Sequence, residues 1–144
     1  MTALLLAHAA ATLGMTGVIW FVQVVHYPLF ARVGEAGFAA YEEAHRRLTT
    51  LVVAPTMLVE AGTGVALLAA RPDGVSAGPA WAGLVLLVVA WLSTVLVQVP
   101  CHDRLQRGFD PGVARRLVRT NWLRTAAWTA RSGLVLALLA QAVG

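Results

Sequence analysis

Four long apolar stretches limit the fold of this chain more than any other feature. They cover residues 3–30, 48–70, 79–99 and 120–143, which is most of the 144-residue sequence. A helix needs roughly 20 mostly apolar residues to cross the hydrocarbon core of a bilayer. The composition, 58% hydrophobic and only 12% charged, is also unusual for a soluble domain. The sequence therefore predicts an all-α fold: one integral membrane four-helix bundle over residues 1–144, with up-down-up-down topology.

The basic residues indicate how such a bundle would lie in the membrane. All eleven are arginines, and none precedes Arg32. Three lie between the first and second stretches and five between the third and fourth, whereas the intervening link holds only Arg71. Short arginine-rich loops stay in the cytoplasm, so we expect a multi-pass protein of the plasma (inner) membrane with both termini outside. We expect a lipid bilayer as partner and no nucleic acid, because no basic face is interleaved with aromatic residues.

Prolines, glycines and charges mark where the helices should begin and end. The first helix is expected to end near residues 26–28, because the residue before Pro28 is pushed out of the α region. Residues 34–47 are polar on one side and predict an amphipathic interfacial helix that leads into the second span. Residues 71–74, with the sequence RPDG, predict a turn. Asp110 is expected to cap the fourth helix.

Polar residues recur at spacings of three or four on each predicted helix, which gives every helix one polar stripe. Facing lipid, these groups would lack hydrogen-bond partners, so we expect the stripes to face one another. The predicted topology brings one end of each stripe to a similar depth near the cytoplasmic side. The candidate catalytic residues there are His26, His45, His102, Gln98, Asn121 and Arg124.

These residue types suit two kinds of chemistry. Any of the three histidines could be a general base near neutral pH, while the amides and the arginine could stabilise an oxyanion. Alternatively, a mixed nitrogen and oxygen shell of His26, His45, His102 and Glu60 could hold iron, copper or zinc. No two of these histidines have the spacing of a compact metal motif. The cofactor prediction therefore stays open between none and a histidine-bound metal.

Five further residues lie deep in the predicted spans. A charge at the centre of a membrane costs roughly 2.5–3.5 kcal/mol on insertion scales. Glu60 and Arg131 lie at comparable depth, so we predict that they form a buried ion pair. Trp20, Trp91 and Trp128 could form the walls of a pocket for a flat hydrophobic ligand.

Two motifs in the last third of the chain resemble a known family. Residues 99–105 (VPCHDRL) and 121–125 (NWLRT) resemble the anthrone oxygenase-like family of small four-helix membrane proteins. The resemblance implies a cofactor-independent oxygenase that converts anthrones to anthraquinones. The chain departs from the family pattern at Cys101-His102, where the family has a leucine–asparagine pair, and His26 and His45 are additional.

The leading functional hypothesis is an oxygenase-like oxidoreductase that acts on a lipophilic phenolic or quinone-like molecule in a polar pocket near the cytoplasmic side. Such an acidic molecule needs only a base to become a carbanion or phenolate that reacts with oxygen. The alternative is a non-catalytic carrier of a metal or small molecule, or a subunit of a larger membrane complex. A carrier with so few spans would be expected to form a homo-oligomer. Nucleotide-dependent enzymes and common hydrolases are not supported, because their motifs are absent from the sequence.

Overall fold

The computed structural model describes residues 2–70 and 76–143, which contain helices and short links and no strand. Four helical segments follow in chain order. The first consists of α1 (Thr2–Phe21), η1 (Val22–His26), α2 (Tyr27–Leu29) and η2 (Phe30–Arg32). The second is α3 (Glu35–Ala69), the third consists of α4 (Ala77–Ser93), η3 (Thr94–Gln98) and α5 (Val99–Leu105), and the fourth is α6 (Pro111–Val143).

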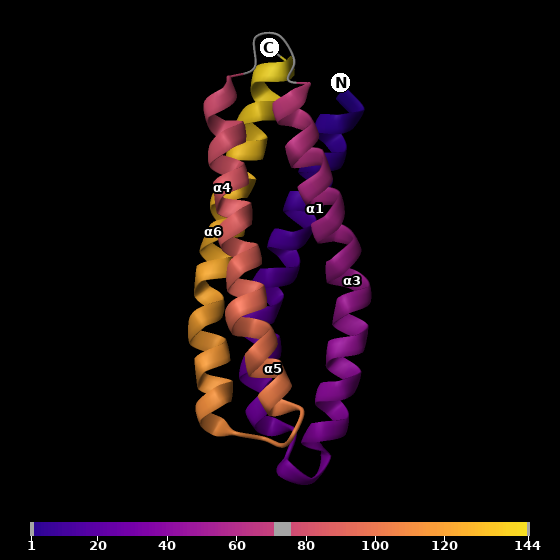
Figure 1. Cartoon of the computed structure of the whole chain (residues 1–144), viewed down its shortest axis with the longest axis vertical. Helices are drawn as coiled ribbons and strands as arrows, with labels where there is room; N and C mark the ends of the chain where they lie inside the picture. The colour runs from indigo at the N-terminus through magenta and orange to yellow at the C-terminus, as the bar shows by residue number, and fades with distance from the viewer. Residues whose placement is uncertain (1, 71–75, 144) are drawn as a thin grey trace.

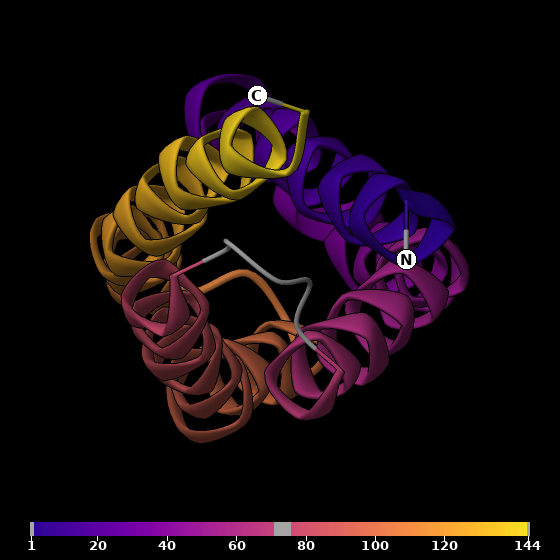
Figure 2. The ribbon, with the colours of Figure 1, turned by 90° about the horizontal axis from the view of Figure 1, so that it is seen from above.

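The four segments stand side by side around a closed ring. Contacts join α1 to α3, α3 to α4, α4 to α6 and α6 back to α1, as the view along the bundle shows (Figure 2). Both termini lie at one end, and the links before α3 and before α6 lie at the opposite end, close to α5 (Figure 1). Residues from all four segments can therefore meet inside the ring near these links.

Three segments are long and apolar enough to cross a membrane: Thr2–Arg32, Glu35–Ala69 and Ala77–Leu105. The fourth predicted span, residues 120–143, is helical but is not among them. Arg124 and Arg131 lower its mean hydropathy, although both side chains are buried inside the bundle. Hydropathy averages over all faces of a helix, so it does not register that these charges point away from the outer surface.

The outer surface of the bundle carries many large apolar side chains, whereas several charged and polar side chains are buried among the apolar ones inside. Leu51, Leu58 and Leu96 are each more than 60% exposed, at 69%, 62% and 65%. The carboxylates of Glu42 and Glu60, in contrast, are completely buried. Such an exterior is compatible with contact with a lipid bilayer.

The first helix does not end at residues 26–28, contrary to the expectation from Pro28. It widens into a π-helical turn at η1, where the Tyr27 N–H bonds to the Val22 carbonyl five residues back. The chain then remains helical through Arg32. A wider turn reduces the clash of a proline ring with the preceding turn and accommodates its missing N–H. The same arrangement recurs at η3, directly before Pro100.

The amphipathic segment and the second span form one continuous helix. Gly34 precedes α3 with a φ of 84°, in the left-handed region that glycine adopts without steric cost. From Glu35 the helix runs 35 residues and passes through Pro55 without ending. The buried face of its first three turns therefore has a fixed rotation relative to the rest of α3.

The α6 helix begins with the predicted cap. Asp110 Oδ1 accepts hydrogen bonds from the backbone N–H groups of Gly112 at 2.7 Å and Val113 at 3.0 Å, and Pro111 occupies the first helical position. This prediction is confirmed. The turn predicted at residues 71–74 lies outside the described residues.

Candidate functional site

Five polar side chains from the helical elements next to the two links lie in contact with one another. They are His26, Tyr27, Glu42, His45 and His102, referred to below as the histidine cluster. His26 is the last residue of the π turn η1 and Tyr27 the first of α2, whereas Glu42 and His45 lie one turn apart on α3. His102 comes from α5. The cluster thus joins three of the four helical segments.

Glu42, His102 and Tyr27 form a hydrogen-bonded chain. The Nδ1 atom of His102 lies 2.5 Å from Glu42 Oε1, and its Nε2 atom lies 3.0 Å from the Tyr27 hydroxyl. An ionised carboxylate only accepts hydrogen bonds, so Nδ1 carries a proton. In the neutral imidazole, Nε2 then accepts from the Tyr27 hydroxyl. The carboxylate orients the ring and would stabilise an imidazolium if Nε2 took up a proton.

His26 and His45 form the second part of the cluster. His26 Nε2 lies 2.7 Å from His45 Nδ1, and the Thr49 hydroxyl lies 3.1 Å from the same His45 atom. The rings of His45 and His102 are 5.2 Å apart between centroids. All three predicted histidines therefore meet at one place.

Three residues of the cluster have a geometry that suits a metal ion. One ligand atom each from Glu42, His45 and His102 lie within 4.8 Å of one another, and all three residues are buried. This corrects the predicted ligand set, because Glu42 takes the place assigned to Glu60 and His26 is not in the group. Sequence reasoning missed Glu42 because an acidic residue on an amphipathic segment is expected to be exposed to water. Its spacing of three from His45 was the available signal.

A cavity of about 350 Å³ adjoins the histidine cluster inside the ring of helices. Much of its wall is apolar and includes Met15, Ile19, Val53, Met57 and Trp91. Its polar lining includes Tyr27, His45, His102, Gln98 and Arg124. The volume and the mostly apolar lining with a few polar groups are typical of a site for a small lipophilic molecule.

Three residues that line the cavity have buried polar atoms without a hydrogen-bond partner in the part of the chain that the structure describes. They are Gln98 Oε1, Arg124 Nε and Trp91 Nε1. The first is an acceptor and the other two are donors. An unsatisfied buried polar group costs about 1–3 kcal/mol, and these three atoms are enclosed within the cavity wall.

The remaining predicted residues support these groups. Arg124 donates from NH1 to Asn121 Oδ1 at 3.0 Å, and its guanidinium lies 5.3 Å from the centre of the Trp128 ring. Asn121 is itself held by Gln23 at 2.9 Å and does not line the cavity. Asn121 therefore holds the Arg124 side chain from behind the cavity wall.

Of the three tryptophans expected to form walls, only Trp91 lines the cavity. Trp20 is 41% exposed on the outer surface, where it donates to Thr129 Oγ1 at 3.0 Å. Trp128 is fully buried and donates to Glu60 Oε2 at 2.9 Å. The expectation for Trp20 was wrong because depth alone does not determine which side of a helix faces inward. Trp128 does face inward, but it packs against Glu60 and Arg124 and is not part of the lining of this cavity.

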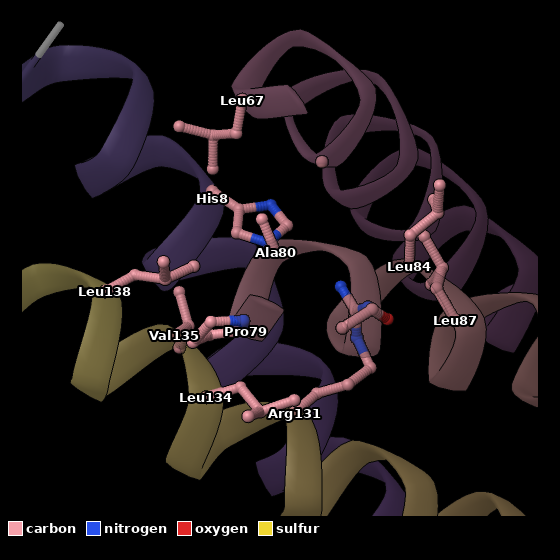
Figure 3. A pocket seen from close by; sticks show the side chains of 12 residues that line it. His8, Leu67, Pro79, Ala80, Leu84, Leu87, Arg131, Leu134, Val135 and Leu138 are labelled. Carbon is pink, nitrogen blue, oxygen red and sulfur yellow. The ribbon is translucent and has the colours of Figure 1, made fainter. Parts of the chain in front are cut away.

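Glu60 and Arg131 form the expected buried ion pair, with 2.9 Å between Glu60 Oε1 and Arg131 Nε. Arg131 NH1 also donates to the carbonyl oxygen of Gly83. Figure 3 shows Arg131 and His8 among the apolar side chains that line a second, much smaller cavity of about 10 Å³. This volume is barely enough for one water molecule. The pair is therefore separate from the histidine cluster.

Beside the histidine cluster, Arg46, which also lines the large cavity, forms an ion pair with Asp103 at 2.8 Å. It also donates to Gln106 Oε1. These contacts join α3 to the end of the third segment beside the links.

No protein-family model, curated protein or solved structure matches this chain. The candidate function therefore depends on the chemistry of the site itself. That site combines a mostly apolar cavity with a carboxylate–imidazole–phenol chain at its edge.

Proposed function

We propose that this chain is an integral membrane protein whose four helical segments cross the bilayer with up-down-up-down topology. The apolar exterior and the three long apolar segments support this proposal. Eight arginines lie in the links before α3 and before α6 or in the helical elements that adjoin them, and both termini lie at the other end of the bundle (Figure 1). Short arginine-rich loops remain inside, so the links face the cytoplasm, the termini face outward and the membrane is the plasma membrane. The start of α3 lies at the interface.

The function proposed for this bundle is that of an oxygenase-like oxidoreductase. Its substrate is a lipophilic phenolic or quinone-like molecule bound in the large cavity. The observation that carries this assignment is the large, mostly apolar cavity whose lining includes a few polar residues, among them Tyr27, His102 and Arg124. A flat ring with oxygen substituents would occupy the apolar part, and its carbonyl and hydroxyl groups would bond to the polar lining. The resemblance to anthrone oxygenases supports the same substrate class.

The proposed reaction begins when the substrate loses a proton at an acidic CH₂ or hydroxyl group. The histidine cluster favours the resulting anion, either because His102 accepts the proton or because the cluster holds a metal. Arg124 and Trp91 donate to the oxygen on which negative charge develops. For an anthrone-like CH₂ group, the carbanion forms a C–O bond with O₂, and the peroxide takes the proton back. Loss of water then leaves a carbonyl, so one CH₂ and one O₂ give one C=O and one H₂O.

The second candidate is a non-catalytic carrier of a metal or a lipophilic molecule. The three potential metal ligands beside the cavity favour it. A carrier and an enzyme would share the binding site and differ only in turnover. Measurement of binding and of oxygen consumption on the same protein therefore separates them.

The test uses the full chain purified in detergent, with anthrone as the probe. Binding is followed by tryptophan fluorescence and turnover by an oxygen electrode. Gln98→Leu and Arg124→Met should each lower oxygen uptake, the latter by roughly 10²–10³-fold, the loss typical of one oxyanion donor. Gln141→Leu is the matched control, because Gln141 is exposed and bonds Ser76 far from the cavity. Equal uptake by all these variants would contradict the proposal, and binding without uptake would favour the carrier.

A further inference from the structure

We propose that Glu42, His45 and His102 bind one divalent transition-metal ion at the edge of the large cavity. Two imidazoles and one carboxylate are the ligand set that binds Fe²⁺ in non-haem oxygenases, and the same atoms also bind Co²⁺ and Zn²⁺. The ion would activate the substrate in place of a free base. The role of the ion in a reaction rests on the proposed function, whereas the binding of the ion to these three residues does not.

The backbone already places the three ligands within reach of one ion. Glu42 and His45 are three residues apart on one face of α3, and His102 projects from α5. Their ligand atoms lie within 4.8 Å of one another. Bonds of about 2.0–2.2 Å to one ion hold such atoms roughly 3 Å apart. Small side-chain rotations would therefore complete the site without moving a helix.

The carboxylate of Glu42 provides independent evidence for a missing cation. Its side chain is completely buried, and Oε2 has no hydrogen-bond partner among the described residues. Within residues 2–70 and 76–143, His102 is its single partner at ion-pair distance. Buried carboxylates are normally paired or bound to metals, and one shared hydrogen bond leaves half of this group unsatisfied.

The two histidines are held as metal ligands usually are. A ligating histidine almost always donates its other ring N–H to a neighbouring group. His45 contacts His26 through Nδ1, which leaves Nε2 for the ion. His102 contacts the Tyr27 hydroxyl through Nε2 and Glu42 through Nδ1. An ion bound at Nδ1 would replace the proton there, and Nε2–H would then donate to the Tyr27 hydroxyl. His26 and Tyr27 are thus the outer partners.

The position of the site suits catalysis. His45 and His102 both line the large cavity. Coordination positions that the protein does not fill would therefore face the space assigned to the substrate. A phenolate or enolate oxygen bound there would receive direct charge stabilisation from the ion.

The experiment is a Co²⁺ titration of the full chain in detergent after removal of metals with a chelator, followed by visible absorption. We expect one Co²⁺ per chain. Glu42→Gln, His45→Gln and His102→Gln should each weaken binding at least 100-fold. His26→Gln should weaken it by roughly 10–100-fold, as expected for an outer partner. His8→Gln is the matched control, because His8 is a buried histidine bonded to Thr63 outside the cluster. It should leave binding unchanged.

Glu42→Asp guards against a trivial loss of folding, because it keeps the charge and withdraws the carboxylate by one methylene. It should keep the helical circular-dichroism spectrum of the wild type and still lose Co²⁺ affinity.

The inference is overturned if the wild type binds no Co²⁺, or binds it no better than the three ligand variants. In that case a proton alone joins Glu42 to His102. Anthrone oxidation by the metal-free protein would overturn the ion's role in the reaction and leave the proposed function standing. Stoichiometric Co²⁺ without anthrone binding would support the inference and refute the proposed function.

Discussion

The Glu60–Arg131 ion pair offers a direct measurement of how buried charges stabilise this bundle. Both side chains are almost completely buried, at 0% and 2% exposure. Glu60 accepts from Arg131 through one oxygen and from Trp128 through the other. The substitution Glu60→Gln keeps an acceptor for Trp128 and removes only the negative charge, while Arg131→Met removes the positive charge with little change in length.

The expected cost follows from what each substitution leaves behind. Glu60→Gln leaves a guanidinium without its counter-charge, and Arg131→Met leaves a carboxylate held only by an indole N–H. Removal of one partner of a buried pair costs about 3–5 kcal/mol, whereas apolar replacement of a whole pair is often neutral. The double variant should therefore be more stable than either single variant, with a coupling free energy on the order of 3 kcal/mol.

The assay is unfolding in mixed micelles by titration with sodium dodecyl sulfate, followed by circular dichroism. The wild type, both single variants and the double variant form a double-mutant cycle. Leu58→Met is the control, because Leu58 is 62% exposed on the outer surface, and it should shift the free energy of unfolding little. If the two single costs add to the double cost within about 0.5 kcal/mol, the charges do not stabilise each other and the reasoning is refuted.

Three further predictions concern other parts of the molecule. Asp110→Ala should lower the free energy of unfolding by about 1 kcal/mol in the same assay, because it removes an N-cap. An unchanged free energy of unfolding would show that the cap does not stabilise α6. Asp103→Asn breaks the partly exposed pair with Arg46 and should cost less than about 1 kcal/mol, and a cost that persists undiminished in high salt would contradict a surface pair. In single-tryptophan variants, brominated lipids should quench Trp122, which is 49% exposed, and spare Trp128, which is fully buried; equal quenching would contradict the packing.

Helical periodicity and depth predicted much of this site from sequence. Residues His26, His45 and His102 are far apart in the chain, yet the assumption that polar stripes face inward predicted that they would meet, as they do. The same reasoning paired Glu60 with Arg131. Both predictions use only spacing along a helix and the cost of polar groups in lipid, and these do not depend on the details of packing.

The parts that sequence did not predict depend on helix rotation. Glu42 is buried because the first turns of α3 continue rigidly into the span. The rotation of the whole helix about its axis therefore determines which way the Glu42 side chain points. Trp20 points outward for the same kind of reason. The π turns at η1 and η3 are not visible in local propensities, because a proline predicts the end of a helix just as well. Rotation and turn width are decided by packing between helices.

The two π turns also make the site sensitive to chain length. A π turn contains one residue more than the α-helical turn it replaces. Deletion of a single residue from η1 would allow a regular helix of nearly the same length and hydropathy. It would also rotate everything before the deletion by about 100° relative to Tyr27, so the residues of α1 and those of α2 could no longer both face the cavity. A one-codon deletion could therefore remove the binding site and still leave a chain that inserts and folds as a bundle.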